Sequence, residues 1–195
     1  GSSANDVWAV GGAGAILRWN GTSWISVRGP TTSALSGVWV SPTNEMWAVG
    51  TGGTIVRWNA GVWTSVWRGT YDQLLAVWGS SDSDVWAVGL ADSILRWRGT
   101  SPPNVSKGTQ ASLLAVSGTS ACDVWVVGGG GTILRWDGRW GRVSSPTTNS
   151  LTGLWSSAPN DAWAVGRAGT ILRWNGTAWV RVPSGTTTDL HAVWG

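Results

Sequence analysis

The sequence predicts an all-β protein, a five-bladed β-propeller made of four-stranded antiparallel blades. Three observations predict it. A segment of about 39 residues repeats five times, each copy holds four short runs rich in Val, Ile, Leu and Trp, and turn residues separate these runs. Four strands in a unit of about 40 residues, repeated four to eight times, are typical of a propeller. We therefore expect residues 1–195 to form a single domain.

The repeat length follows from one Trp that recurs in segments such as Asp-Val-Trp-Ala-Val-Gly. Its copies are Trp8, Trp47, Trp86, Trp125 and Trp163, which are 39, 39, 39 and 38 residues apart. The step from the last copy through the C-terminus to the first would be 40 residues, so five steps account for all 195 residues. Five repeats should close a ring and so leave no exposed sheet edge.

Each run has a predicted place in its blade. The run at 35–39 has Gly or Ala at its third position in all five copies, which suits a crowded axis, so we place this strand innermost. The run with the recurrent Trp becomes the second strand, and the run at 16–19 the third. Asn20-Gly21 and its equivalents predict a type I′ hairpin into the outermost strand, since both central residues of that turn need positive φ.

The chain ends divide one blade between them. Residues 190–194 are a fifth copy of the innermost strand, and 6–10 are a second strand without an inner neighbour in the sequence before it. We expect these two segments to pair and so to close the ring. The chain lacks an initiator methionine, so we expect an excised or trimmed domain.

The rare residue types argue against an enzyme. The chain has one Cys, one His and one Tyr beside 19 Trp and 29 Gly. One Cys excludes a disulfide framework and a cysteine metal cluster, and one His disfavours a His-paired nucleophile. We interpret His191 as structural, Cys122 as a small buried or loop residue, and Tyr71 as part of a loop. The chain is expected to use neither metal nor cofactor.

Charge and hydropathy exclude further classes of function. The net charge is +3, and Arg recurs once per repeat instead of clustering, so nucleic-acid binding is not expected. No apolar run approaches the length of a membrane-spanning helix, and no signal peptide is visible. We expect a monomer that does not insert into membranes. Its location is not determined, although a bacterial extracellular or cell-surface site is compatible with the sequence.

Two sets of repeated residues are candidate binding groups. One is the Trp that follows the Asx-Gly turn, where burial is least assured; its members are Trp24, Trp63, Trp140 and Trp179. The third repeat lacks it and has Ser101-Pro102-Pro103-Asn104-Val105 there, and two prolines cannot donate to a ladder. Four such Trp suggest four weak, similar sites.

The second set combines arginines and acids at equivalent places. It comprises Arg18, Arg57, Arg135 and Arg173 with Asp6, Glu45, Asp123 and Asp161, and the third repeat has Arg96 and Asp84. These residues could hold sugar hydroxyls in a groove. They could equally form structural ion pairs or backbone contacts between blades. The sequence leaves both alternatives open, as it does for the packing of the Trp after the turn.

The repeats resemble the Trp-rich propeller repeats of myxobacterial proteins, of the form VWAVGxxGTILRWNGTxW. They are more distantly similar to the Asp-box repeats of sialidases and to photosystem-assembly-factor propellers. The turn is shorter than in an Asp-box and Arg replaces its usual Ser, so the resemblance implies the fold and not sialidase activity. Trp136-Asp137-Gly138-Arg139-Trp140 also weakly resembles the hairpin of small fucose-binding propeller lectins.

Two functions follow as hypotheses. The first is a multivalent, lectin-like module that binds glycans through the exposed Trp and their polar neighbours. The second is a non-catalytic scaffold or protein-interaction propeller in which every repeated Trp serves packing. Trp and Arg are enriched at protein interfaces as well, so composition does not separate the two. Retention of the same residues in most repeats favours the first.

Overall fold

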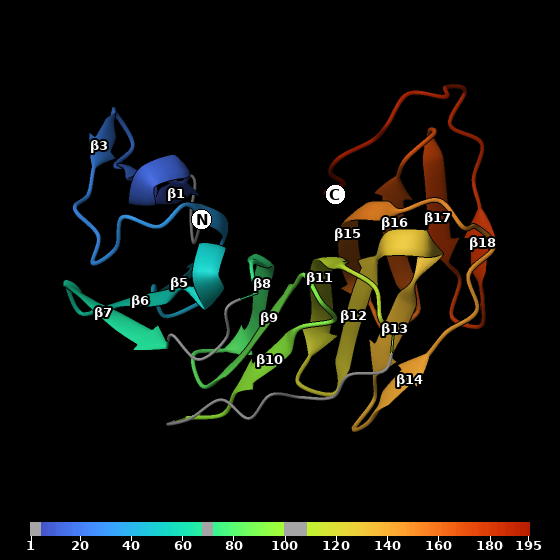
Figure 1. Ribbon diagram of the computed structural model, residues 1–195, viewed down its shortest axis with the longest axis horizontal. Helices are drawn as coiled ribbons and strands as arrows, with labels where there is room; N and C mark the ends of the chain where they lie inside the picture. The colour runs from blue at the N-terminus through green and yellow to red at the C-terminus, as the bar shows by residue number, and fades with distance from the viewer. Residues whose placement is uncertain (1–4, 68–71, 100–108) are drawn as a thin grey trace.

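The computed structural model describes residues 5–67, 72–99 and 109–195. Within these ranges the chain forms five antiparallel sheets that follow one another in an open arc (Figure 1). Each sheet is one repeat, and its strands are neighbours in the order in which they occur in the sequence. An apolar membrane-spanning helix is absent from the described residues.

Within the described residues, the first three blades hold ten strands. Blade 1 comprises β1 (Val7–Val10), β2 (Ile16–Trp19) and β3 (Trp24–Ser26). Blade 2 comprises β4 (Leu35–Val40), β5 (Met46–Gly50), β6 (Ile55–Asn59) and β7 (Val62–Trp67). Blade 3 comprises β8 (Leu74–Ser81), β9 (Asp84–Gly89) and β10 (Ile94–Trp97).

The last two blades have four strands each. Blade 4 comprises β11 (Leu113–Ser120), β12 (Asp123–Gly128), β13 (Ile133–Trp136) and β14 (Trp140–Arg142). Blade 5 comprises β15 (Leu151–Ala158), β16 (Asp161–Gly166), β17 (Thr170–Trp174) and β18 (Trp179–Arg181). Three short 3₁₀ turns, η1 (Gly12–Gly14), η2 (Thr51–Gly53) and η3 (Gly129–Gly131), connect second strands to third strands.

The predicted innermost strands do line the axis. β4, β8, β11 and β15 contact one another from blade to blade. At their third position a Cβ on Gly37 would lie only 3.2 Å from the Cα of Ala76, and one on Gly153 only 2.9 Å from the Cα of Ala192. Small residues are therefore required there because the backbones of successive inner strands come this close.

The glycine-rich turns need left-handed backbone at two successive positions. In η3 these are Gly130 and Gly131, with φ of 61° and 69°. A Cβ on Gly131 would overlap the carbonyl oxygen of Thr147, whereas one on Gly130 would meet nothing within 4 Å. Gly131 thus needs to be Gly for its close approach to the connection that enters the next blade, although in the third repeat Asp92, with φ of 61°, occupies the equivalent position.

The predicted type I′ hairpin occurs in one repeat and is wrong for the others described. Ala60 and Gly61 both have positive φ, at 49° and 87°, and join β6 to β7 directly. At the first repeat the loop is two residues longer, and Gly21 has positive φ while Asn20 does not. The Asn20 side chain instead accepts the backbone N–H groups of Thr22 and Ser23, which closes the longer loop.

The core is divided among the spaces between successive blades. Four clusters of buried residues occur, and each combines side chains of two neighbouring sheets. The cluster between blades 4 and 5, for example, joins Val127 and Ile133 to Leu151 and Leu172. Stability therefore depends mainly on contacts between neighbouring repeats, as expected for a repeat protein.

The predicted closure of the ring is absent from the strand pairing of the described residues. β1 is paired with β2 on one side and has no inner partner, and residues 190–194 belong to no strand. Figure 1 shows blade 1 and the C-terminal segment on opposite sides of a gap in the arc. Blade 1 consequently has three strands instead of four, and closure stays a prediction. In blade 3 the fourth strand was expected within 100–108, outside the described residues.

Candidate functional site

The four Trp that follow the turn differ widely in exposure. Trp24 in blade 1 is 49% exposed, whereas Trp179 in blade 5 is 4% exposed. Trp63 and Trp140 are half-buried. Their exposure therefore depends on the position of the blade in the arc, because Trp24 has no preceding blade to cover it. The equivalent segment of the third repeat, 101–105, lies outside the described residues.

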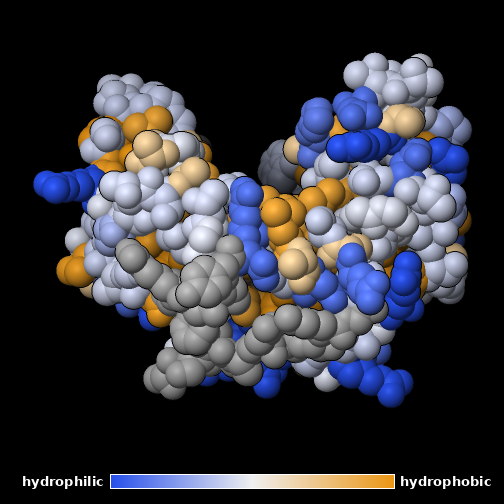
Figure 2. All heavy atoms as spheres, in the orientation of Figure 1, coloured by the Kyte–Doolittle hydropathy of each residue, from blue (hydrophilic) through white to orange (hydrophobic). Residues whose placement is uncertain are grey.

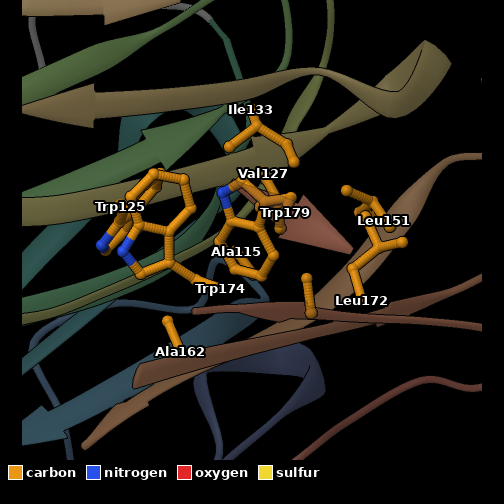
Figure 3. Packing of buried hydrophobic residues seen from close by; sticks show 10 residues of the cluster. Ala115, Trp125, Val127, Ile133, Leu151, Ala162, Leu172, Trp174 and Trp179 are labelled. Carbon is orange, nitrogen blue, oxygen red and sulfur yellow. The ribbon is translucent and has the colours of Figure 1, made fainter. Parts of the chain in front are cut away.

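Trp63, Trp140 and Trp179 each pack against the second-strand Trp of the preceding blade. Trp125 of β12 lies 4.9 Å from Trp174 and 5.2 Å from Trp179, measured between ring centroids. Figure 3 shows these three rings together at one end of the cluster, with Leu151 and Leu172 at the other. Trp125 and Trp179 meet edge to face at 90°, an arrangement that aromatic quadrupoles favour.

The same three-ring arrangement occurs at two further junctions. Trp8 packs against Trp58 and Trp63, and Trp86 packs against Trp136 and Trp140. At the junction of blades 2 and 3, Trp47 packs against Trp97 with centroids 5.6 Å apart. We call this contact the Trp junction: one Trp from a second strand against the Trp that ends the third strand and the Trp that begins the fourth strand of the next blade.

The arginines and acids form ion pairs within each blade. The shortest N–O distances lie between 2.5 and 3.0 Å, and the pairs are Arg18–Asp6, Arg57–Glu45, Arg96–Asp84, Arg135–Asp123 and Arg173–Asp161. The strand register explains them. Each Arg lies directly opposite the second-strand Trp, for example Arg135 opposite Trp125, and the acid two residues earlier points to the same face.

Each guanidinium also lies over the ring of that Trp. The distance from Cζ to the ring centroid is 4.4 Å for Arg96 over Trp86 and 5.2 Å for Arg18 over Trp8. Arg96 further donates to the carbonyl of Ala121, which belongs to the next blade. The arginines therefore make ion pairs, cation–π contacts and, in blades 3 and 4, backbone contacts with the following blade.

The Asp161 carboxyl is more acidic than an ordinary Asp. A hydrogen bond from the Ser157 hydroxyl, followed by one from Arg173, lowers the pKa of the Asp161 carboxyl below its ordinary value. The two donors lie 2.7 and 3.0 Å from different carboxylate oxygens. Asp161 is consequently held as an anion that accepts hydrogen bonds, and it does not serve as a proton donor at neutral pH.

Sequence reasoning missed a second feature, a groove beside the connection that leaves the blade, which occurs at blades 1 and 4. In blade 1 a groove of about 840 Å³ lies between the η1 turn and residues 26–33, with Arg28 in its lining. The equivalent groove beside η3 measures about 480 Å³ and includes Arg142. Both are open to solvent, and Gly, Ser and Thr make up at least half of the residues that line them.

The grooves depend on a repeated Thr in these connections. The hydroxyls of Thr31, Thr147 and Thr186 each accept the backbone N–H two residues later, which fixes the turn. Pro30-Thr31-Thr32-Ser33 and Pro146-Thr147-Thr148-Asn149 were visible as a pattern in the sequence. This pattern could have identified the connections between blades. It could not have predicted the grooves, because the space between a connection and a glycine turn depends on the fold.

Of the single Cys, His and Tyr, two lie within the described ranges. Cys122 is exposed in the turn before β12, and His191 is exposed near the C-terminus. Tyr71 lies outside the described residues. Among the described residues, no three His, Cys, Asp or Glu side chains are grouped so as to hold a metal ion.

Comparison with known proteins relates the chain to propellers by fold. No family model matches, and no curated protein matches. Among solved structures, the WD40 propeller domain of Doa1 has a TM-score of 0.80 at 13% identity, covering 98% of this chain and 69% of that chain. The WD40 repeats of RRP9 have a TM-score of 0.78 at 14% identity, covering 91% of this chain and 60% of that chain.

A third similar structure is "YCF48 bound to D1 peptide", with a TM-score of 0.68 at 18% identity; 88% of this chain and 61% of that chain are covered. The chain thus spans about three fifths of the length of the YCF48 and RRP9 structures. The structural similarity establishes a propeller repeat fold. Sequence identities this low carry no information about function. The relation to the myxobacterial repeats and to the Asp-box is not tested by these comparisons.

Proposed function

We propose that this chain is a non-catalytic propeller scaffold that binds protein partners through one region of its surface. The observation that carries the proposal is the unequal exposure of its equivalent residues. The repeated Trp largely contact one another at the junctions and the Arg and acids pair within their blades, whereas blade 1 leaves Trp24 49% exposed. One asymmetric apolar surface suits a protein partner better than it suits several equal sugar sites.

The groove of blade 1 extends this surface. It runs along residues 26–33, which continue directly from β3. Backbone groups and the exposed Arg28 offer hydrogen bonds to the main chain and to the acidic groups of an extended peptide. The solved YCF48 propeller bound to a D1 peptide supports a peptide as the kind of ligand that this fold can take.

Selection of binding peptides tests the proposal. We expect a displayed peptide library to yield peptides that bind the chain, and Arg28→Glu to weaken their binding about tenfold or more through charge reversal at the groove. Arg142→Glu makes the same change in the lining of the smaller groove of blade 4 and is the control. A library that yields no binder, or binders indifferent to Arg28→Glu, contradicts the proposal.

Carbohydrate binding remains the second candidate, and the exposure of Trp24 beside Trp19 is the observation that favours it. Single sites of this kind would bind with a Kd of about 1 mM, and several on one ring would gain about 10²–10⁴-fold on a dense glycan surface. Glycan-array binding that falls stepwise on Ala substitution of Trp24, Trp63, Trp140 and Trp179 would support it. A blank array would favour the scaffold.

A further inference from the structure

The junction of blades 3 and 4 contains a cavity whose lining carries groups of both charges. Its volume is about 140 Å³, and it lies between the turn that joins β9 to β10 and the outer strand β14. Asp92 lines it from blade 3, Arg142 and Trp140 line it from blade 4, and Thr109 lines it from the connection between the two blades. The cavity is therefore built by two neighbouring repeats.

Asp92 brings an acid to a position where the other repeats have glycine, namely Gly14, Gly53, Gly131 and Gly169. Its backbone is left-handed, with φ of 61°, which few residues other than glycine adopt. Asp92 is also only 5% exposed. A buried acid on a left-handed backbone is costly, so its presence in this repeat needs a reason beyond the fold.

Thr109 holds the Asp92 carboxylate in place. The Thr109 N–H donates to Asp92 Oδ2 at 3.0 Å, and the Thr109 hydroxyl donates to Oδ1. A carboxylate can accept about four hydrogen bonds, so these two position the group without using its whole capacity. The turn of the connection does not need the acid, because it forms beside a glycine at the equivalent residues Thr31, Thr147 and Thr186.

Arg142 supplies the opposite charge. Its side chain is exposed and pairs with no acid in the part of the chain that the structure describes. Figure 2 shows strongly hydrophilic residues at the surface around β14, in the lower right of the view. Asp92 and Arg142 thus line one cavity without pairing with each other, so a molecule that carries both charges can lie between them.

The volume of the cavity limits the size of such a molecule. A cavity of about 150 Å³ holds benzene, so about 140 Å³ accommodates about six non-hydrogen atoms. The buried side chains of Ile94 and Leu134 form an apolar part of the lining, which suits a short carbon chain. Alanine has this size and combines an ammonium group, a carboxylate and a methyl group.

We propose that this cavity binds a small zwitterion, an amino acid of the size of alanine, with its ammonium group at Asp92 and its carboxylate at Arg142. The Trp140 indole N–H is buried, has no hydrogen-bond partner within the described ranges, and is a further donor for that carboxylate. The ligand contacts both blades, so its binding also stabilises their junction.

The junction of blades 4 and 5 provides an internal comparison. Arg181 has the same place in β18 as Arg142 has in β14, since each lies opposite a third-strand Leu. Gly131, however, stands where blade 3 has Asp92. This junction has the arginine without the acid and should not bind a zwitterion.

Titration of the chain with alanine and two of its fragments tests the proposal. Propionate retains the carboxylate without the ammonium group, and ethylamine retains the ammonium group without the carboxylate. We expect alanine to bind with a Kd of about 0.1–1 mM and each fragment to bind about tenfold or more weakly, as measured by NMR titration. No detectable binding of alanine, or equal affinities for alanine and propionate, overturns the proposal.

Two variants assign the two charges. Asp92→Gly installs the residue of the other repeats, and Arg142→Gln removes the charge of an exposed side chain. Each should weaken alanine binding about tenfold or more. Asp92→Gly should weaken the binding of ethylamine but not of propionate, and Arg142→Gln should do the reverse. Arg181→Gln is the matched control and should change none of these affinities.

A second variant of the acid keeps the test decisive if Asp92→Gly disturbs the Thr109 connection. Asp92→Asn retains the shape of the side chain and tolerates a left-handed backbone. Alanine binding that is unchanged in either Asp92 variant overturns the proposal. The peptide groove of blade 1 and Arg28 do not line this cavity, so failure here is distinguishable from failure of the proposed function.

Discussion

Trp86 is the residue whose loss should cost the fold most. It is fully buried and contacts Trp136, Trp140 and the guanidinium of Arg96. We expect Trp86→Ala to lower the free energy of unfolding by about 3–5 kcal/mol, because a cavity remains between blades 3 and 4. Chemical denaturation measures this change.

Trp24→Ala is its control, since that ring is 49% exposed. The expected loss is about 1 kcal/mol or less, in line with the smaller area that Trp24 buries. Equal losses for the two variants would mean that the Trp junctions contribute little to stability.

Asp161 should make a contribution to stability that is lost in acid. Its pKa is lowered in the folded state, chiefly by Ser157 and then by Arg173. A lowered folded-state pKa stabilises the fold above the ordinary pKa of Asp, about 3.9, and the stabilisation disappears as the pH falls through the folded value. An NMR titration of the carboxyl should have its midpoint below the ordinary value.

Ser157→Ala should raise this midpoint, since it removes the principal donor. Ser156→Ala is the matched control because the Ser156 hydroxyl has no hydrogen-bond partner. A midpoint that is the same in the wild type and in Ser157→Ala would contradict the assigned cause.

At the scale of the elements, glycine serves two purposes in the η3 turn: it adopts a positive φ, and at one position it leaves room for a neighbouring carbonyl. Gly131→Ala should cost about 3 kcal/mol or more, since it adds both left-handed strain and overlap with the Thr147 carbonyl. Gly130→Ala should cost only about 1 kcal/mol. Ala13, Ala91 and Ala168 already occupy the equivalent position with φ of 52–53°.

Thermal unfolding of the two variants checks this difference. The neighbouring positions have similar φ, so backbone strain is nearly matched between them. Similar melting temperatures for Gly130→Ala and Gly131→Ala would show that the close approach to Thr147 does not constrain the turn.

For the whole molecule, the segment 190–195 should stabilise blade 5 whether or not the ring closes. It covers Gly153 and lies beside the ring of Trp155. Its deletion uncovers β15 and removes the hydrogen bonds of Leu190 to Gly166 and Thr152. We expect a lower melting temperature and aggregation through the uncovered strand. An unchanged transition of a soluble monomer would contradict this role.

The repeat made much of the fold predictable. The spacing of Trp8 and its copies predicted the number of sheets, and turn residues predicted roughly where the strands lie. Even the ion pairs could have been placed. Trp125 and Arg135 are opposite because the turn between their strands has a fixed length, and Asp123 shares their face because strand side chains alternate. Hairpin register is local, so the sequence of one repeat contains it.

Exposure was decided only by the tertiary structure. Trp24 and Trp179 occupy the same place in their repeats, yet one is 49% and the other 4% exposed, because blade 4 covers Trp179 and no blade covers Trp24. Burial here comes from the neighbouring blade, and neighbours depend on the curvature of the arc. Curvature results from packing summed over every junction, so identical repeats give an interior junction and an open end from the same residues.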